Sequence, residues 1–99
     1  KFSEIEKLTV NIQGAGAAPA YLQLSVSLEL ENEAQKVAID ELLPRVRDQF
    51  QAYLRELRLE DLNGSAGVLR IKEELLRRVN VAAAPYKVRD VLLKEMLVQ

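Results

Sequence analysis

The strongest candidates for chemistry in this chain are paired acidic side chains. The 99 residues include no His and no Cys, which removes the commonest ligands of zinc, copper and haem and the usual nucleophile pairs. Adjacent acidic pairs such as Glu60-Asp61 and Glu73-Glu74 remain. Neighbouring residues of a helix point about 100° apart, so neither pair converges on one substrate atom. We therefore expect a non-enzymatic protein with no catalytic residue, metal or cofactor.

A Gly-rich stretch at residues 13–19 has the composition of a phosphate-binding loop. However, neither a helix nor a Lys-Ser or Lys-Thr pair follows it, so it predicts a connection between two strands. The formal net charge is −1, and the chain has no Trp, three Tyr and two Phe. This charge and this aromatic content are not typical of a nucleic-acid surface. We expect no nucleic-acid partner.

Length and composition predict one globular domain over residues 1–99. Hydrophobic residues make up 48% and charged residues 29% of the chain, which is ordinary for a domain with its own core. No apolar stretch approaches the roughly 18–20 residues that cross a bilayer, and the first residues lack the apolar core of a secretion signal. Because the chain begins with Lys1 and not Met, we expect a processed or truncated fragment, and any membrane anchor lies outside it.

Two segments near the start alternate between apolar and polar residues, the period of a half-buried strand. They cover residues 5–12 and, with the cleaner alternation, residues 22–31. We expect the two strands to pair as an antiparallel hairpin, with the polar face of the second one in water. The segment Val88–Val98 predicts a final strand, with an irregularity near Asp90 where the alternation is imperfect.

Helical periodicity follows the second strand. Asn32 is a preferred N-cap, and Gln35 three positions later can complete a capping box. Pro44 interrupts the pattern, because proline has no N–H and clashes with the preceding turn. We therefore expect a kink, or two helices that meet near Leu43, with the second piece ending near Leu57.

A further helix is expected over Ser65–Val81, with Asn63-Gly64 as the turn before it and Ser65 as its cap. The predicted order is therefore β-β-α-α-α-β. This is an α+β domain, in which a small antiparallel-based sheet carries helices packed on one face.

Short motifs occur in a fixed order along nearly the whole chain. None is diagnostic alone, but together they define a pattern. They are Val10-Asn11, Tyr21-Leu22 before the alternating strand, Pro44-Arg45-Val46-Arg47-Asp48, the stretch Leu54 to Gly67, Leu69-Arg70, Glu74 to Asn80, and Val88 to Gln99.

This pattern resembles the FliL family of flagellar basal-body-associated proteins. The resemblance implies a periplasmic domain of a single-pass inner-membrane protein, with the anchor preceding Lys1. It also implies a fold similar to the stomatin-type SPFH domain. As partners it implies further copies of the same protein, arranged as a ring, and the ion-driven stator of MotA/MotB type, whose torque output or surface sensing the ring supports. The membrane is contacted only through the anchor.

Charged residues provide the candidate interface. The cluster Arg45, Arg47 and Asp48 is either an intersubunit ion-pair site or a charged, solvent-facing turn around the kink. The halves of the chain also differ: residues 1–44 carry three Lys and seven acids, net −4, and residues 45–99 carry eleven basic and eight acidic residues, net +3. Either the acidic sheet region meets the basic helical region of the next subunit, or both are simply solvated. The candidate interface residues are Arg45, Arg47, Asp48, Arg77, Arg78, Glu29 and Glu31.

Two non-enzymatic functions remain open on these grounds. One is a structural and regulatory ring component beside the stator. The other is a monomeric periplasmic adaptor that binds a partner peptide along a sheet edge.

Overall fold

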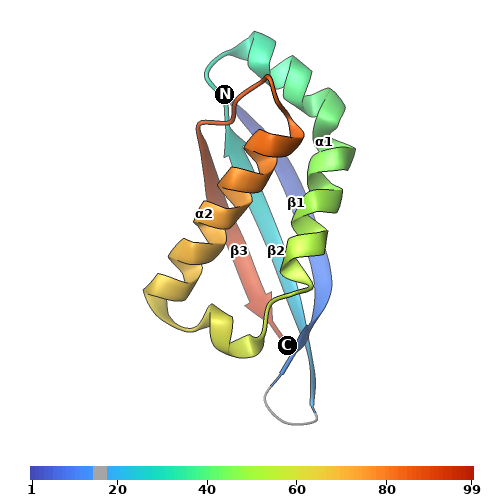
Figure 1. Cartoon of the computed structure of the whole chain (residues 1–99), viewed down its shortest axis with the longest axis vertical. Helices are drawn as coiled ribbons and strands as arrows, with labels where there is room; N and C mark the ends of the chain where they lie inside the picture. The colour runs from blue at the N-terminus through green and yellow to red at the C-terminus, as the bar shows by residue number, and fades with distance from the viewer. Residues whose placement is uncertain (15–17) are drawn as a thin grey trace.

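The computed structural model describes residues 1–14 and 18–99. Three strands and two α-helices form two layers, with both helices on one face of the sheet (Figure 1). The expected strand connection at residues 13–19 falls partly on residues 15–17, which lie outside the described residues. The elements are β1 (Phe2–Gln13), β2 (Pro19–Glu29), α1 (Glu33–Leu54), the 3-10 helix η1 (Leu59–Leu62), α2 (Gly64–Ala82) and β3 (Asp90–Val98).

The sheet is antiparallel, with the strand order β1-β2-β3. The alternation seen in the sequence places the apolar side chains of β1 and β2 under the helices, and these side chains are buried. The predicted hairpin and the last strand are therefore confirmed. Their core partners on the helices are Ile39, Val46, Phe50 and Leu54 from α1, and Ile71, Leu75 and Val79 from α2.

Both outer strands contain a bulge, and both bulges lie beside Ser25 of the central strand. In β1 the register shifts between Ile5 and Leu8, and in β3 Lys94 is the extra residue. Lys7 in the first bulge has a φ of 55°, and its N–H donates to the Ser25 hydroxyl at 3.1 Å. The irregularity expected near Asp90 thus lies further along β3, at Lys94.

The prediction of three α-helices is wrong, because α1 is continuous through Pro44. Pro44 is exposed, so water can reach the carbonyl that its missing N–H leaves unpaired. Asn32 caps α1 as expected, accepting from the Gln35 N–H at 2.9 Å. The capping box is not completed, since the Gln35 side chain accepts instead from the backbone N–H of Lys87.

A short 3-10 helix and a tight turn precede α2. Gly64 begins the helix with a φ of 72°, and the helix follows Asn63 as its cap, so Ser65 is not the cap. Gly67 packs so closely on η1 that an added Cβ would lie 2.5 Å from the carbonyl oxygen of Asp61. A residue without a side chain is therefore needed where η1 meets α2.

The helices divide the sheet between them. α1 packs on β1, and α2 packs on β3 (Figure 1). β3 begins at Asp90 and not at Val88, because the Asn80 side chain holds both the N–H and the carbonyl of Val88 at 2.7 and 3.2 Å. Within the described ranges, no helix is long and apolar enough to cross a membrane.

Candidate functional site

The three candidate residues on α1 lie near the middle of a continuous helix and not on a turn. Arg45 and Asp48 are exposed. Arg47 is half-buried, and its guanidinium donates to the backbone carbonyls of Glu6 and Lys7 at 3.1 and 3.4 Å. Arg47 therefore ties α1 to the bulge of β1, and this contact lies within one molecule.

The two candidate residues on α2 share one carboxylate. Arg77 and Arg78 both pair with Glu74, and their hydrogen bonds lower the pKa of Glu74 to about 2. Arg77 thus pairs with the acid three residues before it, and Arg78 pairs with the same acid four residues before it. Arg78 also lies 5.0 Å from the centre of the Tyr53 ring, a distance at which a guanidinium is attracted to the ring face. Arg78 joins the two helices, and Arg77 is the more exposed member of the pair.

The two acidic candidates lie where β2 ends. Glu29 is half-buried, and its carbonyl accepts from the Arg89 N–H at 2.8 Å. Glu31 is exposed and lines a hollow of about 580 Å³ between the start of α1 and the end of α2, where Lys87 and Arg89 supply opposite charge. The seven candidates therefore lie in three separate places on α1, on α2 and at the end of β2.

The acidic pairs considered for chemistry are used structurally. Asp61 accepts from the Arg58 N–H at 2.8 Å, and Glu60 pairs with the Arg58 side chain. Glu74 is held by the two arginines of α2. Over residues 1–14 and 18–99, no group of three His, Cys, Asp or Glu side chains is placed to hold a metal ion.

A polar network on the helix-free face of the sheet was missed by the sequence patterns. Ser27, expected in water, is only 4% exposed, and its hydroxyl donates to Glu4 at 2.8 Å. The Lys94 ammonium donates to the other oxygen of the same carboxylate at 2.9 Å. These bonds, the one from Lys94 first, lower the pKa of Glu4. Alternation assigns Ser27 to the correct face but does not show that long side chains cover it.

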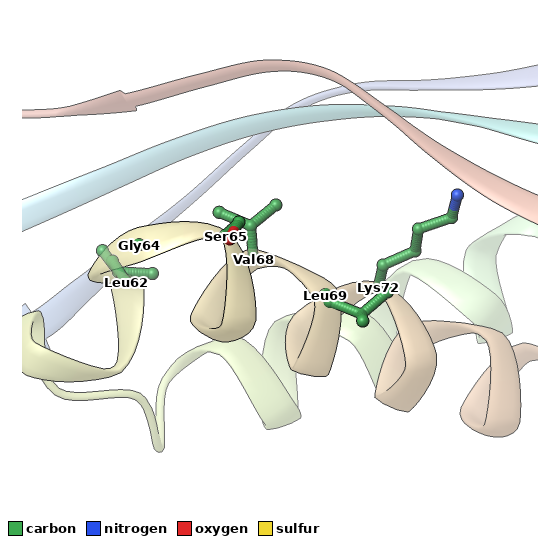
Figure 2. Close-up of a pocket in the computed structure, with 6 residues that line it drawn as sticks. All are labelled: Leu62, Gly64, Ser65, Val68, Leu69 and Lys72. Carbon is green, nitrogen blue, oxygen red and sulfur yellow. The ribbon is translucent and has the colours of Figure 1, made fainter.

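The second feature that was missed is an apolar surface along the outer edge of β3. Met96, Leu97 and Val98 are 36%, 49% and 37% exposed. The first turns of α2, the helix that packs on β3, border an open hollow of about 700 Å³. Figure 2 shows Val68 and Lys72 directed from α2 toward the layer of strands. The hollow is lined by Leu62, Gly64, Ser65, Val68, Leu69 and Lys72.

Comparison with known proteins identifies the family. A family model described as flagellar basal body-associated protein FliL matches residues 2–99. The chain belongs to the FliL family. Two relatives from strains of Caulobacter vibrioides, each described as a flagellar FliL protein, are 46% identical to it over 97 residues. That match covers 98% of this chain and 47% of each relative.

Membership of the FliL family makes this domain a component associated with the flagellar basal body. The family is one of flagellar structural or accessory proteins and is not a known enzyme family. The chain spans about half the length of the curated relatives it matches.

Proposed function

We propose that this FliL domain is a non-enzymatic component of the flagellar motor that assembles with further copies of itself, as a ring, around or beside the ion-driven stator. In this position it supports torque output or surface sensing. The observation that carries the proposal is the family match over residues 2–99. The whole protein is anchored by a single span in the inner membrane, with this domain on the periplasmic side and similar in fold to an SPFH domain.

The arrangement of charge supports assembly in a head-to-tail manner. A ring requires two different patches that fit each other. Arg45, Asp48 and Arg77 are exposed on the helix layer, and Glu31 is exposed where β2 ends. Arg47 and Arg78 are half-buried and bind within the molecule, whereas Arg77 stays exposed although it pairs with Glu74. The exposed residues are therefore the better interface candidates.

Disulfide crosslinking in cells tests the ring, because the chain has no Cys. Arg77→Cys and Glu31→Cys are placed together in the full-length protein, and the products of oxidation are separated by gel. A ladder of self-adducts, together with adducts that contain the stator, is expected. The matched control is Thr9→Cys, which is exposed on the helix-free face of the sheet. An equal ladder from the control, or no adduct from the test pair, contradicts the proposal.

A second function is favoured by a specific observation, the apolar outer edge of β3. An exposed strand edge offers backbone donors and acceptors to an extended peptide. In this alternative the domain is a monomeric adaptor that binds a partner peptide along that edge. Stator adducts without a self-ladder would favour it over the ring.

A further inference from the structure

The last residues of β3 present unused backbone groups along the outer edge of the sheet. Tyr21 and Gln99 exchange both of their backbone hydrogen bonds, at 2.8 and 2.9 Å. Since bonded and non-bonded pairs alternate in an antiparallel ladder, the N–H and carbonyl of Met96 and of Val98 point away from β2. Among the described residues no further strand lies beyond β3. An added strand would find two residues ready to pair.

The hollow beside this edge is apolar with a single cationic end. Leu62, Val68 and Leu69 supply its apolar lining. Lys72 is the one charged residue among the described lining residues. It lies 3.4 Å from the Asp90 carboxylate, with about a third of its side chain exposed. Because an ammonium group has three donors, Lys72 can bind a second carboxylate beside Asp90. A ligand that matches this lining is therefore apolar and carries a carboxylate at the end next to Lys72.

The helix layer limits what can reach the edge. Three strands about 4.8 Å apart make a sheet roughly 14 Å wide, whereas two packed helices need about 8–10 Å each. The helices therefore overhang the sheet, and the first turns of α2 extend past β3 (Figure 1). A partner that brought its own helix layer would collide with α2. A single extended segment would not.

We propose that the outer edge of β3 from Glu95 to Val98 and the hollow beside α2 form one binding site for an extended, mainly apolar segment with an acidic residue at its C-terminal end. The segment adds as an antiparallel strand, with alternate side chains in the hollow and its acidic end near Lys72. This inference rests on peptide binding at the sheet edge, the part of the adaptor alternative that does not require the domain to be monomeric, and it assigns the site and the ligand. The site can therefore be tested whether or not copies of the domain form a ring.

The size of the surface also favours a short segment over a second copy. Six exposed or half-buried apolar residues make up the site, whereas a stable protein dimer uses about 20–30 residues from each side. Strand addition gains much of its affinity from main-chain hydrogen bonds, so it needs fewer side chains. These six residues are Leu62, Val68, Leu69, Met96, Leu97 and Val98.

Panning of the full-length protein against a displayed library of random ten-residue peptides tests the site. Selected peptides are expected to alternate apolar and polar residues, to end in an acidic residue, and to bind Leu69→Glu at least about tenfold more weakly. The matched control is Val81→Glu, which changes another exposed apolar residue of α2 outside the hollow. Peptides that bind both variants equally, or a library that yields no binder sensitive to Leu69→Glu, would overturn the proposal.

Backbone pairing has its own readout. Hydrogen exchange of the segment 94–99, followed by mass spectrometry, is expected to slow when a selected peptide binds. Met96→Pro removes an outward N–H that an edge strand can spare, and it should abolish both binding and protection, whereas Met96→Ala keeps both. Protection caused by self-association, present without peptide and dependent on protein concentration, would instead assign the edge to a second copy. Because this assay does not use the crosslinking positions, it can fail while the ring survives, or succeed while the ring fails.

Discussion

The two edge strands of the sheet, β1 and β3, are protected in different ways. At the β1 edge, α1 runs alongside the strand, Arg47 occupies the carbonyls of Glu6 and Lys7, and Gln13 forms a bridge to Arg58. At the β3 edge, the Lys72–Asp90 ion pair and the Lys94 bulge interrupt only the first half. The second half is apolar, and the helix that packs on this strand, α2, carries the hollow on its first turns.

This difference shows that edge protection here is local. Exposed apolar edges promote association, and proteins usually blunt them with bulges, charges or covering elements. β1 has all three of these. β3 has a helix over one face, a charge and a bulge, but the charge and the bulge do not extend beyond Glu95. The second half of β3 is thus an exposed apolar strand edge. A binding function explains this exposure, whereas the stability of the fold does not require it.

Truncation of a core side chain of α1 is the change with the largest expected effect on stability. Phe50 is a fully buried residue of α1 in the core between the helices and the sheet. Phe50→Ala should therefore lower the free energy of unfolding by about 3–5 kcal/mol. Leu69→Ala on the α2 side should change it by less than about 0.5 kcal/mol, since Leu69 is exposed. Urea unfolding followed by circular dichroism measures both. Equal losses would show that the β3 side is as tightly packed as the β1 side.

A methyl group at Gly67 tests how tightly η1 packs on the first turns of α2, which line the hollow. The added Cβ would lie 2.5 Å from a backbone oxygen of Asp61, so η1 or α2 must shift. Gly67→Ala should cost about 1–3 kcal/mol of stability in the same urea experiment. Ser65→Ala, at an exposed position in the same turn of α2, serves as the control and should be close to neutral. A neutral Gly67→Ala would mean that η1 moves freely.

Periodicity predicted most of the fold because burial is one-sided. The strands and the helical stretches after residue 32 follow from alternating and 3.6-residue patterns, which directly record the buried face. The prediction of separate helices around Pro44 was wrong because the effect of a proline depends on whether the carbonyl that it leaves unpaired reaches water. That exposure is a tertiary property. The β3 bulge lies opposite Ser25 of the central strand, and its position belongs to the pairing of two strands, which no local pattern in β3 records.

The candidate site was less predictable, because charge patterns do not distinguish internal from external partners. Arg47 and Arg78 look like their exposed neighbours in the sequence, yet one binds backbone carbonyls of β1 and the other covers Tyr53. The exposed outer edge of the second half of β3 could not be predicted from the sequence either, since it depends on the order of the strands and on the position of α2. The interface role of all seven candidate residues stays a prediction.

The Arg47 contact is expected to have a moderate effect. Arg47→Ala removes two hydrogen bonds from a charged donor and should destabilise the domain by about 1 kcal/mol. Hydrogen exchange in residues 2–9 should become faster, because the β1 bulge loses its contact with α1. Arg45→Ala, an exposed neighbour on the same helix, should leave both quantities unchanged. If Arg47→Ala does not alter exchange in β1, the contact does not protect that edge.

The smallest effect is expected from the network that joins the two edges across β2. The Lys94 ammonium and the Ser27 hydroxyl hold the pKa of Glu4 below its ordinary value, and Glu4 in turn raises the pKa of Lys94. A carboxyl whose pKa is lowered by folding stabilises the fold above its ordinary pKa of about 4.3, and this contribution is lost as the pH falls through the lowered value.

Carbon-13 NMR titration of the Glu4 carboxyl should therefore show a rise in its pKa in Lys94→Met and a smaller rise in Ser27→Ala, following the order of the two causes. Because Glu4 and Lys94 are exposed, the stability change at neutral pH should be small, as is typical of surface ion pairs. Salt should weaken the effect of Lys94 but not that of Ser27. An unchanged Glu4 pKa in Lys94→Met would show that the edges are not coupled across the central strand.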